Sequence, residues 1–265
     1  MPTKPATAFL LVIIGCLASL VARGEDFRVA TRVFVGDNPR PASKNLTLFA
    51  DEIVYDFMET APGETTVFNA ATGQFDMLDP ARKVRTTMAT DQLLRFTAAL
   101  KVRIGENERI DPLVRFAAHP RFTSTYDNAR KQLVLQSPLM TYRTSGVAAS
   151  DERVGKYHRF CDWFGQLNAT RPGALPPFAR MRLNQELATQ NLVPQETTLT
   201  IVTRRAGDRT TVLRSRHEFA RTISDADKQR MDAARAQIAE FTWVAFHEFC
   251  GVHLQADRAS AAGRK

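Results

Sequence analysis

The sequence predicts an α+β protein: a curved antiparallel β-sheet, half-barrel-like, with helices packed on one face and a long C-terminal helix. Two observations predict it. Short segments rich in β-branched and aromatic residues fill residues 27–88, and the turns between them are too short for a crossover helix, so neighbouring strands must be antiparallel. From residue 90 onward, several segments carry apolar residues at helical spacing instead.

The expected strands are separated by turn residues. Asp51 and Glu52 join two segments in a tight hairpin, and in the second of these Ile53, Tyr55 and Phe57 alternate with other residues at the period of a strand. The strands are expected at residues 27–35, 46–50, 53–57, 65–69, 74–78, 83–88, 122–126, 132–136, 139–144, 196–203 and 209–216.

The expected helices have recognisable beginnings. Asp111 precedes a proline at a first helical position, and Ser224 with Asp227 three residues later forms a variant of the capping box. The helices are expected at residues 91–102, 112–119, 150–167 and 177–190, with a last long one from Ser224 whose apolar end is Phe241 to Phe249.

An apolar run at residues 8–21 follows Lys4 and predicts a secretory signal peptide. The run is shorter than the roughly 20 residues of a membrane span. Small residues before Glu25 favour cleavage there, which gives a signal peptide at 1–24, a single domain at 25–255 and a disordered tail at 256–265. The protein is then exported, to the periplasm or the extracellular space. A lipobox-like sequence that ends at Cys16 keeps lipid anchoring open, and a retained anchor is a third alternative.

The charge of the chain is basic but dispersed. Thirty-six Lys and Arg against 28 Asp and Glu give a net charge of +8 among 265 residues. The basic residues are scattered singly, whereas a nucleic-acid-binding domain presents a basic stripe. We therefore expect no nucleic-acid partner.

Two cysteines remain after cleavage at the expected site, Cys161 and Cys250. An exported protein folds under oxidising conditions, so the two could form a disulfide. They could equally be two unrelated buried thiols. Each follows a histidine by three residues, and His158 and His247 would complete a zinc tetrahedron, the least favoured alternative.

Catalytic motifs are missing from the sequence. No serine lies in a G-x-S-x-G elbow, and Gly251 stands where a zincin would have its second histidine. There is no dinucleotide-binding or phosphate-binding glycine loop. We therefore predict no enzyme activity, no metal and no cofactor.

Aromatic residues on the expected strands are the candidates for ligand binding. They fill the layer between sheet and helices, or they line a cavity for an apolar ligand, and the sequence leaves both open. The candidates are Phe49, Tyr55, Phe57, Phe68, Phe75 and Tyr142.

Residues 48–57, 64–69 and 73–80 resemble a family of uncharacterised exported bacterial proteins. Over residues 27–145 the plan of hairpins, helices and further strands is also similar to the outer-membrane lipoprotein carrier superfamily. That resemblance implies a half-open barrel whose cavity holds acyl chains. Unlike those carriers, this chain starts with a strand and adds a long C-terminal helix, and no functional residue is carried across.

Two functions from different classes follow. The first is a non-catalytic cell-envelope protein that binds an apolar or amphiphilic ligand, such as lipid or lipoprotein acyl chains. The alternative is a structural or protein-interaction module of the envelope with a filled core, which would contact a partner through Phe241, Val244 and Phe249. An aromatic-lined void favours the first and a packed interior the second.

Overall fold

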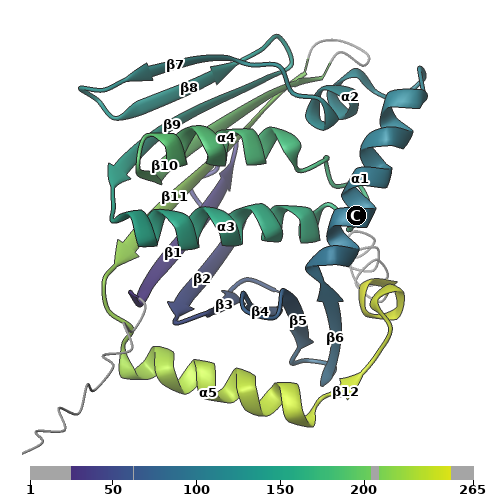
Figure 1. The fold of residues 1–265 in the computed structure, drawn as a ribbon, viewed down its shortest axis with the longest axis vertical. Coiled ribbons are helices and arrows are strands. Elements are labelled where there is room, and N and C mark those ends of the chain that lie inside the picture. Colours follow the sequence, from purple (N-terminus) through teal and green to yellow (C-terminus); the bar gives the residue numbers. More distant parts are fainter. Residues whose placement is uncertain (1–24, 62, 204–208, 252–265) are drawn as a thin grey trace, which may run out of the picture.

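The computed structural model describes residues 25–61, 63–203 and 209–251, which build one 12-stranded sheet with helices packed against it (Figure 1). Strands from both ends of the described chain belong to this sheet. The expected signal peptide and the expected disordered tail lie outside the described residues.

The sheet consists of two runs of sequential strands, β1 to β6 and β7 to β11, which join where β1 pairs with β11, and β12 is added at the β6 edge. Across it they run β12-β6-β5-β4-β3-β2-β1-β11-β10-β9-β8-β7. The strands are β1 (Phe27–Val35), β2 (Ser43–Ala50), β3 (Ile53–Met58), β4 (Thr65–Asn69), β5 (Gln74–Asp79), β6 (Val84–Ala89), β7 (Thr123–Asp127), β8 (Gln132–Gln136), β9 (Met140–Ala148), β10 (Leu192–Thr203), β11 (Arg209–Ala220) and β12 (Thr242–Trp243).

The predicted antiparallel pairing is confirmed for every strand pair in the described chain except β12 with β6, which is parallel. The last strand of the second run, β11, pairs with the first strand of the chain, β1. Strand β1 is therefore central, and its Thr31 lies opposite both Asn45 of β2 and His217 of β11. This long-range pairing places residues from the two ends of the chain side by side.

The helices begin where the sequence indicates. Ser150 accepts a hydrogen bond from the backbone N–H of Arg153, and Ser224 and Asp227 form the predicted capping box. No helix in the described part of the chain is both long and apolar enough to span a bilayer. The helices are α1 (Thr90–Glu106), α2 (Pro112–Ala118), α3 (Asp151–Asn168), α4 (Phe178–Thr189) and α5 (Asp225–Glu240).

The predicted long C-terminal helix is wrong. Helix α5 ends at Glu240, Phe241 is extended, and Thr242 and Trp243 pair as β12 with β6. A separate helical segment begins at Phe246. Residues beyond Glu240 also face the core, so the apolar spacing continues across the end of α5. For this reason the spacing in the sequence does not indicate β12.

The predicted packing of all helices on one face is also wrong. Adjacent residues of a strand point to opposite faces. Phe49 packs with residues of α3, whereas its neighbour Leu48 packs with Met231 and Ala234 of α5. We call these two sides of the sheet the α3 face and the α5 face. Figure 1 shows α3 and α4 lying across the sheet on one side and α5 on the other.

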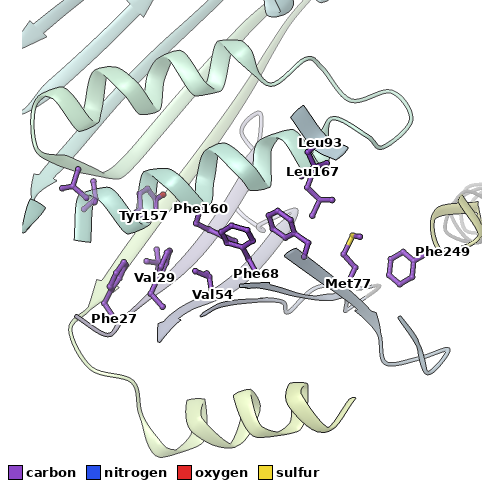
Figure 2. Packing of buried hydrophobic residues seen from close by; sticks show 14 residues of the cluster. Phe27, Val29, Val54, Phe68, Met77, Leu93, Tyr157, Phe160, Leu167 and Phe249 are labelled. Atoms are coloured by element: carbon purple, nitrogen blue, oxygen red, sulfur yellow. The ribbon is translucent and has the colours of Figure 1, made fainter. Parts of the chain in front are cut away.

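The main hydrophobic core lies on the α3 face. Phe27, Val54 and Phe68 from the strands meet Tyr157 and Phe160 of α3 (Figure 2). The core continues toward the C-terminal segment, where Figure 2 places Phe249 beside Met77. It is a closely packed layer, with Phe27 and Phe49 stacked at a centroid distance of 4.1 Å. The helices are thereby held at a fixed height above the sheet.

Candidate functional site

A cavity of about 340 Å³ opens on the α3 face beside this core. It lies between helices α3 and α4 and the strands β1, β2, β3 and β11. It is lined by Thr31, Val33, Asn45, Thr47, Asp56, Tyr157, Phe160, Cys161, Phe164, Gly165, Asn168, Arg180, Ser215 and His217.

The floor of the cavity is a row of hydrogen-bonded polar side chains that crosses neighbouring strands. Thr47 donates to Asp56 Oδ1 at 2.6 Å and Asn45 donates to Asp56 Oδ2 at 2.8 Å. On the far side of β1, His217 lies 3.1 Å from Thr31 Oγ1 and 3.0 Å from Ser215 Oγ. We call these residues the polar row.

The polar row continues beneath α4. Thr197 of β10 lies opposite Ser215 in the register and accepts a hydrogen bond from Thr144 of β9 at 3.2 Å. Thr144 and Thr197 are buried. A buried hydroxyl without a partner costs about 1–3 kcal/mol, so such groups persist in a core only when they are bonded.

Asp56 is a buried titratable group on the floor of the cavity. Its desolvation raises the pKa of the carboxyl, while the hydrogen bonds from Thr47 and Asn45 act in the opposite direction. The carboxylate is therefore held by two donors from the neighbouring strand rather than by a cation.

His217 is the second titratable group of the floor. Burial, with a further contribution from the positive charge of Arg180, lowers its pKa to about 3. The ring is neutral at physiological pH, and both of its nitrogens are engaged by Thr31 and Ser215. In this state His217 is a fixed hydrogen-bonding element of the polar row.

The wall of the cavity is aromatic and comes from α3. Tyr157, Phe160 and Phe164 are spaced three and four residues apart and lie on one side of that helix. Cys161 lines the cavity between them, and burial raises the pKa of its thiol to about 11. A thiol with such a pKa is protonated near neutral pH and is not nucleophilic.

The predicted ligand-lining aromatics do not line this cavity. Phe49, Phe68 and Phe75 are buried in the α3-face core, where Phe68 stacks on Phe75 at 4.4 Å. Tyr55 and Phe57 belong to the cluster on the α5 face.

The sixth candidate, Tyr142, lies in a separate cluster with Leu183 and Leu187 of α4. The six candidates are thus divided between both faces of the sheet and three clusters. Each of them packs in one of these clusters, and Tyr55 also lines a groove on the α5 face.

The two cysteines considered for a disulfide are free thiols in the structure. Their surroundings differ. The charges of Arg180 and Asp162 influence the pKa of the Cys161 thiol, whereas those of Arg171 and Glu64 influence the pKa of the Cys250 thiol. His158 donates to the backbone carbonyl of Leu192 at 2.8 Å. Within the described ranges, no group of three or more His, Cys, Asp or Glu side chains could hold a metal ion.

The structure places the residues of the predicted partner surface, Phe241, Val244 and Phe249, against the core. Phe249 is fully buried, and its backbone carbonyl accepts a hydrogen bond from Arg82 at 2.9 Å. Phe241 and Val244 are partly buried against the core clusters. These residues pack the last described segment against the sheet, and Phe249 is not exposed.

No protein-family model matches this chain, and no curated protein matches it. The resemblance to the lipoprotein carriers therefore stays a prediction.

Sequence reasoning did not single out Asp56, His217 and Arg180, which line the cavity beside the titratable Tyr157 and Cys161. A signal was present in β2, where Asn45 and Thr47 alternate with apolar residues. Polar residues on the inner face of a hydrophobic strand indicate a buried network or a site. The partners of these residues come from strands far away in the sequence, which concealed the network.

Proposed function

We propose that this chain is a non-catalytic cell-envelope protein that holds an amphiphilic small molecule in the cavity of the α3 face. One observation supports this most: the cavity combines an aromatic wall from α3 with a polar floor on β1, β2, β3 and β11. An amphiphile matches both surfaces, since its apolar part lies against the rings and its polar part meets the hydrogen-bonding groups.

The size of the cavity limits the ligand. About 340 Å³ is at the lower end of the roughly 300–1,000 Å³ typical of small-molecule sites. A single-chain amphiphile is therefore a better match than a lipid with several acyl chains. Neighbouring space on this face is filled by Phe49, Phe68 and Phe160, which pack against one another.

The chemistry of the lining favours binding over catalysis. Cys161 has a raised pKa, and His217 is neutral with both nitrogens occupied. Asp56 already accepts bonds from two donors. These groups are bonded to neighbouring side chains or protonated, and none is prepared to attack a substrate or to move a proton.

The same proposal includes export of the protein and a curved, half-barrel form of the sheet. Export rests on the signal-like residues 1–24. In a half-barrel, the α3 face would be the inner side, with α3 and α4 covering the cavity as the helices do in lipoprotein carriers. The shared plan of hairpins followed by helices supports this arrangement.

Native mass spectrometry of the protein purified from its own envelope fraction tests the proposal. The expected result is a bound mass of a few hundred daltons that is released on unfolding. Cys161→Phe, which places a ring in the cavity, should remove it. Gly155→Phe is the matched control, because Gly155 is on the same helix and has open space beside it. Loss of the bound mass in both variants, or its retention in Cys161→Phe, would contradict the proposed site.

A second candidate function is the protein-interaction module. The observation that favours it is an apolar stripe on α1, where Leu94 and Val102 are 52% and 59% exposed and Ala98 lies between them. In the same mass measurement, a protein-sized increment that Leu94→Lys abolishes would support this function instead.

A further inference from the structure

Arg180 is the only cationic side chain that lines the cavity. It projects from the first turns of α4, and its Nε donates to Asn184 Oδ1 at 3.1 Å. Asn184 in turn donates to Asp162 at 2.7 Å, so Asp162 is already bound by an amide. No ion pair joins Arg180 to any other residue in the described part of the chain.

The groups around Arg180 do not neutralise it near pH 7. Burial alone would lower the pKa of Arg180, and Tyr157, Cys161, Tyr142 and Asp162 together raise it. Three of these are phenols or a thiol whose own pKa values are raised, so they are neutral at physiological pH. Asp162 is the only negative charge among them, and it lies outside the cavity lining.

The one acid that lines the cavity is held elsewhere. Asp56 belongs to β3 and is bonded by Thr47 and Asn45 on β2. Its raised pKa comes from burial. The cavity therefore has a hydrogen-bonded carboxyl at its floor and a guanidinium on the α4 side, with the aromatic wall of α3 between the helices and the sheet.

We infer that the ligand carries a single carboxylate that pairs with the guanidinium of Arg180, while its alkyl chain lies along Tyr157, Phe160 and Phe164. This inference rests on the proposed function and names its ligand class, a single-chain fatty-acid-like anion. A guanidinium presents two parallel N–H groups to a carboxylate. One positive charge is balanced by one carboxylate, whereas a doubly charged phosphate would leave a negative charge near Asp56 uncompensated.

The experiment compares ligands that differ only in the head group. Binding of decanoate, 1-decanol and decyl phosphate to the full chain is measured by titration calorimetry at pH 7. We expect decanoate to bind more tightly than decanol by about tenfold to a hundredfold, the range for a charge-assisted hydrogen bond. In Arg180→Gln this preference disappears, because decanoate weakens while decanol is unchanged. Arg180→Lys retains part of it.

Arg182→Gln is the matched control. Arg182 lies on the same helix but pairs with Glu186 at 2.5 Å, and it does not line the cavity. The variant should bind all three ligands as the unaltered protein does. If Arg180→Gln fails to fold, the head-group preference of the unaltered protein still decides the matter.

The outcomes separate this inference from the proposed function. If decanol and decanoate bind with equal affinity, the inference that the ligand carries a carboxylate is wrong, while the proposed amphiphile site still stands. Tighter binding of decyl phosphate than of decanoate overturns the choice of head group. Absence of binding by all three overturns both proposals.

Discussion

Strands β2 and β3 bury both of their sides, one under α3 and the other under α5. On the α5 face their side chains are apolar or aromatic, as Leu46, Leu48 and Tyr55 show. On the α3 face the same strands present Thr47 and Asp56, which alternate with those residues. The two faces are thus formed by the same two strands and are both buried, but their side chains differ in polarity.

The polar row is therefore a feature of the α3 face and has, among the described residues, no counterpart of the same kind beneath α5. On the α5 face these strands pack against a helix mainly with apolar side chains, and Tyr55 also accepts a hydrogen bond from Arg235. Buried polar groups are costly unless they are bonded, and even then they contribute little net stability. Residues of the polar row line the cavity on the α3 face.

The largest expected effects come from the two cores, which should be equally essential. Phe49→Ala on the α3 face should lower the free energy of unfolding by about 3–5 kcal/mol, and Leu48→Ala on the α5 face by about 2–5 kcal/mol. Both side chains are almost fully buried. Urea denaturation measures the change, with the exposed Val102→Ala as control. A loss below about 1 kcal/mol for Leu48→Ala would mean that the α5 face is no true core.

The polar row should show a smaller effect. Thr47→Val keeps the shape of the side chain but leaves a buried oxygen of Asp56 without its closest donor. The expected loss is about 1–3 kcal/mol of unfolding free energy by chemical denaturation. Thr210→Val, at an exposed position of β11, should change stability by less than about 0.5 kcal/mol. If Thr47→Val leaves the free energy of unfolding unchanged, the polar row contributes nothing to stability.

The acid side of the stability curve tests the protonation of His217. Its folded pKa of about 3 lies below its ordinary value of 6.5, so the unfolded chain binds the proton first. Stability should therefore fall as the pH drops from about 6.5 toward 3 and be unaffected by this group above that window.

His217→Gln should flatten this fall without abolishing it, since His158, with a pKa of about 4, contributes with the same sign. Denaturation at a series of pH values, taken as the difference between the two proteins, checks the prediction. Parallel curves for both proteins would mean that His217 is solvated rather than buried.

The attachment of α5 should give the smallest of these effects. Ser224→Ala removes the side-chain cap of α5 and should cost about 0.5–2 kcal/mol. Arg28 on β1, which bonds Asp227 at 2.8 Å, still holds the helix on the α5 face. Thermal unfolding measures the loss, and ligand binding on the opposite face should not change.

Much of the fold could be predicted from the sequence, because hairpins are local. The alternation at Ile53 to Phe57 and the cap at Ser224 depend only on neighbouring residues, and both were correct. The end of α5 was not predictable in this way. Thr242 and Trp243 leave the helical path because they pair with Val84 and Arg85, more than 150 residues earlier.

The candidate site was less predictable for the same physical reason. Aromatic strand residues indicated a buried layer but not which face they fill, since both faces of β2 and β3 are buried. The cavity joins Thr31, Asp56, Arg180 and His217, which the pairing of β1 with β11 and the packing of α4 bring together. No local pattern contains that information.

The most direct test of the central claim, that the α3 face binds an amphiphile and the α5 face does not, is a crystal structure with 10-bromodecanoate. We expect an anomalous bromine signal along the aromatic wall of α3, with the carboxylate at Arg180. The groove between Tyr55 and Met231 on the α5 face serves as the internal comparison. A bromine signal in that groove, or none in the cavity at a saturating ligand concentration, would contradict the account.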